Sequence, residues 1–153
     1  MLNRLKLYLD NCCFNRPYDE PVNQFMSFEI ESKLLIQEQI KKGYFNLVWS
    51  FILDFENEEN PYEDIKESVK NWKKISKEFV QPEDVIRIKA NELRKKYGFG
   101  AKDSLHISCA LYSQCDYLLT TDKKMIKKGL SLNHIKILNP IQFVAQMEEE
   151  NDQ

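Results

Sequence analysis

Four acidic residues carry the clearest chemical signal in this chain: Asp10, Glu56, Asp103 and Asp122. Each stands at or just after the end of an expected strand, or near the start of an expected helix. In a parallel α/β sheet these positions converge on the edge at the carboxyl ends of the strands. Carboxylates gathered there without matching basic groups repel one another, and a bound divalent cation relieves that repulsion. The pattern therefore predicts metal-dependent chemistry.

Each of these acids also has a structural explanation when it is taken alone. Asp10 follows an apolar strand and suits a turn in which its carboxylate accepts a bond from its own backbone. Asp103 lies in the first turn of a helix, where the helix dipole favours a negative charge. Asp122 opens a helix and suits an N-cap. The metal-site interpretation therefore rests on the four residues jointly.

The second acidic position has two candidates, Asp54 and Glu56, on the short helix expected after Ser50. Glu56 is four residues beyond Ile52, which marks the inward side of that helix, so it lies beside that side. Asp54 shares a face with Ser50 and Asn57 and is expected to be solvated. We favour Glu56 and keep Asp54 as the alternative.

Several polar residues close to the acids in sequence are candidates for positioning water or substrate: Asn11, Arg16, His106, Thr120, Thr121 and Lys123. His106 could hydrogen-bond Asp103 or be a packed core residue. The threonines could hold a metal-bound water or a phosphate, but capping and strand propensity explain them equally well. Arg16 could contact phosphate or form a surface ion pair. Lys123 begins a lysine-rich helix that could reach a nucleic-acid backbone or could be a solvated face.

The elements that must position these residues alternate along the chain. Apolar runs predict strands over 5–9, 45–49, 117–120 and 135–138, with an extended segment at 77–82. Helical spacing, caps and prolines predict helices over 22–42, 50–56, 62–76, 82–96 and 102–114, a short one from Lys123 and a closing one from Pro140. Strands that alternate with helices predict a parallel sheet flanked on both faces.

Composition restricts the class of protein. A length of 153 residues with 42% hydrophobic residues predicts one domain, over 1–147, followed by a disordered acidic tail over 148–153. The net charge of −2 gives no dominant basic field, so local lysines and metal ions would have to offset the charge of a nucleic acid. No apolar run approaches the roughly 20 residues that span a bilayer. Neither a secretory signal nor a disulfide framework is evident, which favours a cytoplasmic protein with free thiols.

Three segments resemble the PIN-domain nucleases: YLDNCCFNRP, KDSLHISCAL and DYLLTTDKKMIKK. In order and spacing the likeness extends from about Leu5 to Gln146. The resemblance implies a single-domain three-layer αβα sandwich with a central parallel sheet. It also implies cleavage of RNA with Mg²⁺ or Mn²⁺, often as the toxin of a toxin–antitoxin pair. Such toxins are usually homodimers that a small antitoxin protein inhibits.

In that interpretation all four acids are catalytic, with Asp10 and Asp103 as the core metal ligands. Glu56 and Asp122 would bind through water or orient it, and Asp122 would complete the ligand set. The rival is a PIN-like domain without catalysis that serves as a protein-interaction module. A haloacid-dehalogenase phosphatase also begins with a strand ending in aspartate, but it needs a second aspartate where this chain has Cys12.

Overall fold

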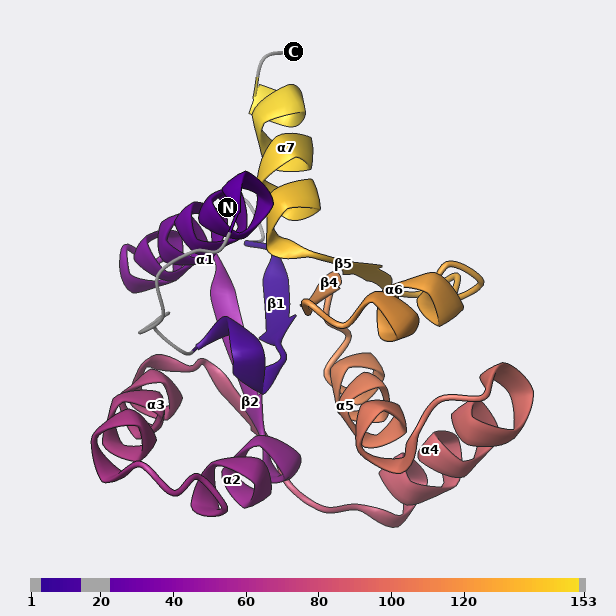
Figure 1. Ribbon diagram of the computed structural model, residues 1–153. Coiled ribbons are helices and arrows are strands. Elements are labelled where there is room, and N and C mark those ends of the chain that lie inside the picture. Colours follow the sequence, from indigo (N-terminus) through magenta and orange to yellow (C-terminus); the bar gives the residue numbers. More distant parts are fainter. Residues whose placement is uncertain (1–3, 15–22, 152–153) are drawn as a thin grey trace.

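A five-stranded, fully parallel sheet forms the centre of the computed structural model, which describes residues 4–14 and 23–151 (Figure 1). The strand order is β3-β2-β1-β4-β5, so the first strand of the chain is the central one. The strands are short and almost fully buried, as expected for parallel sheets covered on both faces. They are β1 (Lys6–Leu9), β2 (Asn46–Ser50), β3 (Glu78–Val80), β4 (Tyr117–Leu119) and β5 (Lys136–Leu138).

Seven α-helices, counted over the described ranges, flank this sheet and complete three layers (Figure 1). A single 3₁₀ turn, η1 (Asn11–Cys13), follows β1. The helices are α1 (Gln24–Lys41), α2 (Phe51–Glu58), α3 (Glu63–Ile75), α4 (Asp84–Tyr97), α5 (Ala101–Tyr112), α6 (Lys123–Gly129) and α7 (Pro140–Asn151). The predicted fold class, a three-layer α/β sandwich around a parallel sheet, is confirmed.

One face of the sheet is covered by α3 and α7, through large aromatic contacts. Phe143 of α7 packs edge-on against Tyr117 of β4, with the ring centroids 5.1 Å apart. Phe14 lies between Trp49 of β2 and Trp72 of α3, with centroid separations of 5.1 and 6.0 Å. Buried aromatic side chains contribute most of the burial energy in a core of this kind.

The opposite face of the sheet contacts α5 and carries polar groups inside the core. Tyr8 pairs with Val48 across β1 and β2, and with Leu118 across β1 and β4, so these residues share a face. Ser50 is two residues beyond Val48 and points to the same side. Buried on this side, Tyr8 contacts His106 of α5. The core therefore contains a polar cluster beneath the carboxyl ends of the strands.

Element boundaries agree closely with the sequence expectations, with two differences. We expected Pro82 within the first turn of a helix, but α4 begins at Asp84 with Glu83 as N-cap. The acidic residues 148–150, expected in a disordered tail over 148–153, continue helix α7. In the part of the chain that the structure describes, no helix has both the length and the apolar character needed to cross a bilayer.

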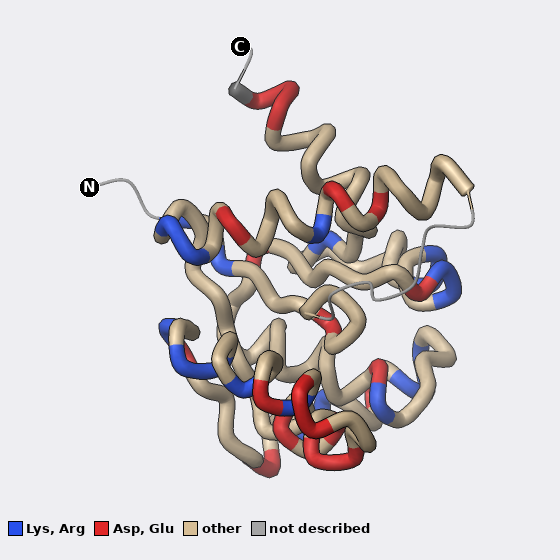
Figure 2. Tube along the Cα trace, turned by 60° about the vertical axis from the view of Figure 1, so that its left-hand side comes forward, with Lys and Arg blue, Asp and Glu red and all other residues tan. Residues whose placement is uncertain are grey.

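Charge is distributed unevenly over the elements. Residues 51–64, which cover α2 and the start of α3, contain six acidic residues and no lysine or arginine. Helix α4 instead contains five basic and two acidic residues. Figure 2 shows the resulting concentration of acidic residues in the lower half of the molecule, the level at which Figure 1 places α2 and α3. The small net charge thus conceals regions of opposite sign.

Candidate functional site

The candidate site lies at the carboxyl edge of the sheet, where β1, β2 and β4 end side by side. Asp10 directly follows β1, and its backbone N–H donates to the carbonyl of Leu119 in β4 at 2.9 Å. Glu56 lies on α2, which begins directly after the last residue of β2. The parallel topology therefore brings together residues that are more than a hundred positions apart in the sequence.

Asp10 is held at the end of β1 by two hydrogen bonds to its carboxylate. Oδ1 accepts from the backbone N–H of Asn11 at 2.7 Å, and Oδ2 accepts from the hydroxyl of Thr120 at 2.7 Å. The hydroxyl oxygen of Thr120 in turn accepts from the backbone N–H of Asp122 at 3.1 Å. Thr120 is fully buried, so its hydroxyl joins two acidic positions through protein groups. Thr120 thus has protein partners on both sides of its hydroxyl, and its suggested role in holding water or phosphate stays a prediction.

Glu56 points to the same place and is fixed by His106. The Nε2 atom of His106 donates to Oε1 of Glu56 in a short contact, and lies 3.9 Å from Oδ1 of Asp10. The imidazole is only 2% exposed, and the two carboxylate side chains are 16% and 20% exposed. His106 therefore lies between the two acids. Of the two interpretations left open for His106, the packed core position fits its burial, and its hydrogen bond goes to Glu56, not to Asp103.

A buried hydrogen-bonded chain supports His106 from below. The hydroxyl of Tyr8 lies 2.6 Å from Nδ1 of His106 and 2.6 Å from the hydroxyl of Ser50. Since a carboxylate only accepts, Nε2 carries the proton shared with Glu56, and Nδ1 is then free to accept from Tyr8. Ser50 can donate to the tyrosine oxygen. This single arrangement satisfies every member, so the chain Ser50–Tyr8–His106–Glu56 is fully bonded.

Asp54 lies in a different environment from Glu56. Its Oδ1 accepts from the indole N–H of Trp49 at 2.8 Å, and its Oδ2 lies 2.9 Å from Nζ of Lys73. These partners hold α2 against β2 and α3. Of the two candidate acids on this helix, Glu56 is the one beside Asp10.

Asp103 and Asp122 join the same electrostatic environment. Burial raises the pKa of the Asp103 carboxyl, and the negative charges of Asp122, Asp10 and Glu56 raise it further, while His106 opposes them. Asp122 also caps α6, because its Oδ1 accepts from the backbone N–H groups of Lys124 and Met125 at 2.9 and 3.2 Å. The capping interpretation of Asp122 is therefore correct. It does not remove the charge of this residue from the cluster.

The remaining candidates are placed less directly. Thr121 donates to the sulfur of Cys12 at 3.3 Å, and Lys123 is exposed at the start of α6. Oδ1 of Asn11 is buried without a hydrogen-bond partner among the described residues. Arg16 lies outside the described residues. The hydroxyls of Thr120 and Thr121 therefore both have protein partners.

The donor set suits a hard divalent cation. One ligand atom from each of Asp10, Glu56 and His106 lies within 4.8 Å of the others. Carboxylate oxygens are the ligands that Mg²⁺ and Mn²⁺ prefer, so Asp10 and Glu56 are the candidate ligands of this triangle, and Nε2 of His106, which carries a proton, orients Glu56. Burial contributes most to the raised pKa of Asp103, and the like charges of Asp122, Asp10 and Glu56, which a cation would neutralise, raise it further. These residues therefore fit a metal ion, although the tightest triangle differs from the expected Asp10–Asp103–Asp122 set.

Sequence reasoning missed the supporting roles of Tyr8 and Ser50. We interpreted Tyr8 only as a strand residue and Ser50 only as an N-cap, which it also is, because its Oγ accepts from the N–H of Leu53 at 3.4 Å. The available signal was two polar side chains inside otherwise apolar strands, since buried polar groups require partners.

Comparisons with known proteins support the fold. No family model matches the chain, and no curated protein sequence matches it. Among solved structures, VapBC2 from Rickettsia felis bound to a DNA fragment from its promoter matches with a TM-score of 0.57 and 15% identity. The match covers 88% of this chain and 98% of the other.

Two further structures give matches of the same kind. FitAcB from Neisseria gonorrhoeae matches with a TM-score of 0.58 and 12% identity over 88% of this chain and 97% of that one. VapBC-1 from nontypeable Haemophilus influenzae matches with a TM-score of 0.55 and 17% identity, over 89% of this chain and 98% of that one. At these identities the likeness concerns the fold. The chain therefore has a PIN-like fold, shared nearly end to end with chains of VapBC and FitAB complexes.

Proposed function

We propose that this protein is a metal-dependent ribonuclease of the PIN type, with residues 1–147 as its nuclease domain. The observation that carries the proposal is the electrostatic coupling of acids from separate segments at one edge of the sheet. Ionised Asp10, Glu56 and Asp122 all raise the pKa of Asp103. Such a repulsive arrangement is characteristic of a cation site.

Each acid has a distinct position in the proposed mechanism. Asp10 is rigid, because both of its carboxylate oxygens accept hydrogen bonds, so it would provide the fixed ligand. Asp103 is half-buried and repelled by the neighbouring carboxylates, so a nearby cation would stabilise its ionised form more than that of the other acids. When bound, Mg²⁺ or Mn²⁺ would supply an activated water and would stabilise charge on the cleaved phosphodiester. Glu56, oriented by His106, would accept the proton of the attacking water.

Cleavage of an RNA pool tests the proposal. Wild-type protein should cleave RNA with Mg²⁺ or Mn²⁺ and stop when EDTA is added. Asp10→Asn should reduce the rate by about a hundredfold or more, as expected for loss of a charge-stabilising group. Asp54→Asn is the matched control, since it makes the same chemical change outside the cluster and should retain most activity. Cleavage that survives both EDTA and Asp10→Asn would refute the proposal.

The same experiment separates the nuclease from an inactive PIN-like interaction module. A competent site binds Mn²⁺ in the folded state, which raises the melting temperature. An inactive module would show neither cleavage nor that shift in the wild-type protein. Asp10→Asn should remove the shift, while Asp54→Asn should preserve it.

We further propose that the protein is the toxin of a toxin–antitoxin pair, acts in the cytoplasm, forms a homodimer and binds a small antitoxin protein. The structural neighbours that support this are chains of VapBC and FitAB complexes. Light scattering should give twice the chain mass. A small reading frame should lie adjacent to its gene, and co-expression of the two should yield a complex that cleaves RNA more slowly. A monomer whose activity no such product alters would contradict this part of the proposal.

A further inference from the structure

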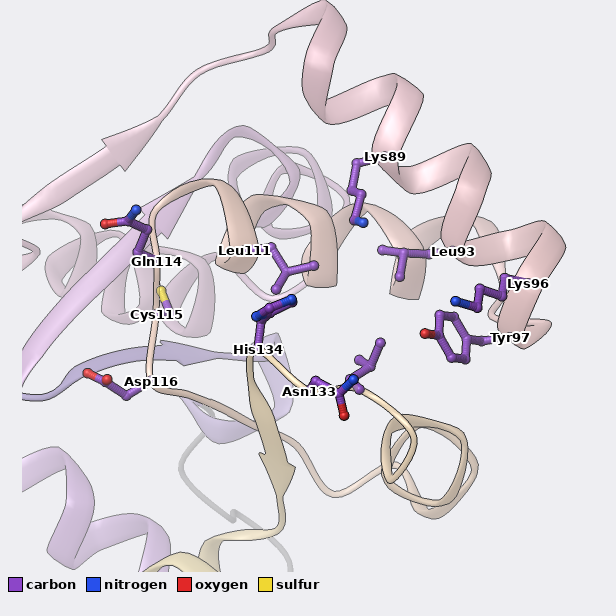
Figure 3. Close-up of a pocket in the computed structure, with 11 residues that line it drawn as sticks. Lys89, Leu93, Lys96, Tyr97, Leu111, Gln114, Cys115, Asp116, Asn133 and His134 are labelled. Atoms are coloured by element: carbon purple, nitrogen blue, oxygen red, sulfur yellow. The ribbon is translucent and has the colours of Figure 1, made fainter.

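A cavity lies at the edge of the sheet opposite the acidic cluster. Its volume is about 620 Å³, and helices α4 and α5 and the segments that precede β4 and β5 enclose it (Figure 3). Cys115 and Asp116 come directly before β4, and His134 comes two residues before β5, so the cavity is at the amino ends of these strands. None of the four candidate catalytic acids lines it. We call it the lysine pocket.

One wall of the lysine pocket is cationic. Lys89 and Lys96 are seven residues apart on α4, which places them on one face of the helix. Both side chains line the pocket, and His134 lies across from them (Figure 3). Nζ of Lys89 is 3.6 Å from Glu92 in an exposed pair, which is a weak interaction. Within the described residues, neither Lys96 nor His134 has a salt bridge, so this wall retains positive charge.

The floor of the lysine pocket is apolar and includes an aromatic ring. Leu93 is buried at 2% exposure, and Leu111 and Leu132 are half-buried beside it. The ring of Tyr97 lies at the lysine end, with Nζ of Lys96 5.4 Å from its centroid. Apolar and aromatic surfaces of this kind suit a planar ring, which stacks and excludes water.

Hydrogen-bonding groups stand at the other end. Gln114 and Asp116 lie away from Lys96 and Tyr97 in Figure 3. The carboxylate of Asp116 is fixed, because its Oδ2 accepts from the backbone N–H of Lys6 at 2.8 Å. The polar ends of both side chains point away from the other lining side chains in Figure 3, so the polarity of the pocket comes from its ammonium groups. The ligand should have an anionic end and a planar end that packs on apolar surface.

From this arrangement we propose that the lysine pocket binds a nucleoside monophosphate. The phosphate pairs with Lys89 and Lys96 beside His134, and the base lies over the leucines and the ring of Tyr97. The volume falls within the roughly 300–1,000 Å³ of small-molecule sites, which leaves room for one nucleotide. The inference does not depend on the proposed nuclease activity, since the two sites occupy opposite edges of the sheet.

Calorimetric titration with AMP tests the proposal, with EDTA present so that no metal at the acidic cluster can hold the phosphate. AMP should bind. Adenosine and inorganic phosphate should each bind at least about tenfold more weakly than AMP, because each lacks one end of the ligand. The double variant Lys89→Gln/Lys96→Gln should weaken AMP binding by about tenfold or more. The double variant Arg94→Gln/Lys95→Gln removes the same charge from α4 outside the pocket and should change the affinity by less than about threefold.

Three results would overturn the proposal. AMP could fail to bind at millimolar concentration. Inorganic phosphate could bind as tightly as AMP, which would indicate attraction of a simple anion. The two double variants could weaken binding equally, which would indicate the diffuse charge of α4. Circular dichroism of each variant checks that the fold is retained, and His134→Ala gives a second, independent loss of affinity. These results are separable from those for the nuclease, because metal-dependent RNA cleavage is measured at the other site.

Discussion

Replacement of Tyr8 by phenylalanine tests the buried chain beneath the acidic cluster. The Tyr8 side chain is fully buried, and its hydroxyl contacts Ser50 and Nδ1 of His106, each at 2.6 Å. Phenylalanine keeps the ring and its packing and removes only the oxygen. The variant therefore isolates the contribution of the hydroxyl and leaves no cavity larger than one atom.

The expected loss follows from the partners that are left behind. Each buried hydrogen bond contributes about 1 kcal/mol net, and a buried group left unsatisfied costs about 1–3 kcal/mol. Ser50 still accepts from the N–H of Leu53, but its hydroxyl proton loses the tyrosine oxygen as acceptor. Nδ1 of His106, which is 2% exposed, has no other described partner and takes the larger cost. Together these contributions predict a decrease of about 2–4 kcal/mol in the free energy of unfolding.

Urea unfolding monitored by circular dichroism measures this decrease. Tyr117→Phe is the matched control, since its hydroxyl accepts one partly buried bond from Gln146 at 3.0 Å and its removal should cost about 0.5–1.5 kcal/mol. Tyr8→Phe should also slow RNA cleavage, because His106 then orients Glu56 less strictly. A loss below about 1 kcal/mol, or one equal to that of the control, would show that the chain is not the supporting element we describe.

Three further predictions concern single side chains. A carboxyl with a raised pKa favours folding while protonated, and this contribution is lost as the pH rises through the folded-state pKa. Without metal at pH 7, Asp103→Asn should therefore keep or raise the melting temperature. A clear fall of the melting temperature in scanning fluorimetry would contradict this. A hydrogen bond from Cys13 lowers the pKa of the Cys12 thiol to about 7. Iodoacetamide at pH 7.5 should therefore label Cys12 before the other cysteines, as followed by mass spectrometry. Equal labelling of all four cysteines would contradict this. Gln114 has a φ of 57°, in the left-handed region that is costly for residues other than glycine. Gln114→Gly should therefore raise the free energy of unfolding, measured in urea, by about 0.5–1 kcal/mol. A decrease would show that the side chain stabilises this turn.

Local chemistry explains why much of the fold could be predicted from the sequence. Ser50 and Asp122 cap the helices that follow them, as their residue types indicate. Gly98 ends α4 in the left-handed conformation that glycine adopts readily. The placement of Glu56 beside the inward side of α2 followed from helical spacing. These features depend on neighbours within a few positions, so one sequence is sufficient to infer them.

The parts that were missed depend on strand register and tertiary neighbours. Tyr8 and Ser50 share a face because Tyr8 pairs with Val48 in the sheet, and no sequence pattern specifies that register. For His106 the sequence left open a bond to Asp103 on its own helix or a packed core position, and only the assembled fold shows that the buried ring bonds Glu56 of α2. The lysine pocket likewise combines α4 with two distant loops. Contacts of this kind become visible only when the elements are assembled in space.

The pairing of the central strand with β4 has a consequence for biosynthesis. The hydrogen bond from Thr120 to Asp10 closes a loop of 110 residues, so the edge that carries the acids does not exist in a nascent chain that ends before β4. Sheets that depend on such distant pairings form late and slowly. A polypeptide still emerging from the ribosome would therefore lack the complete acidic edge until β4 and Asp122 had been made. A protein that degrades RNA would in this way be inert toward the very message that encodes it until that segment had been translated.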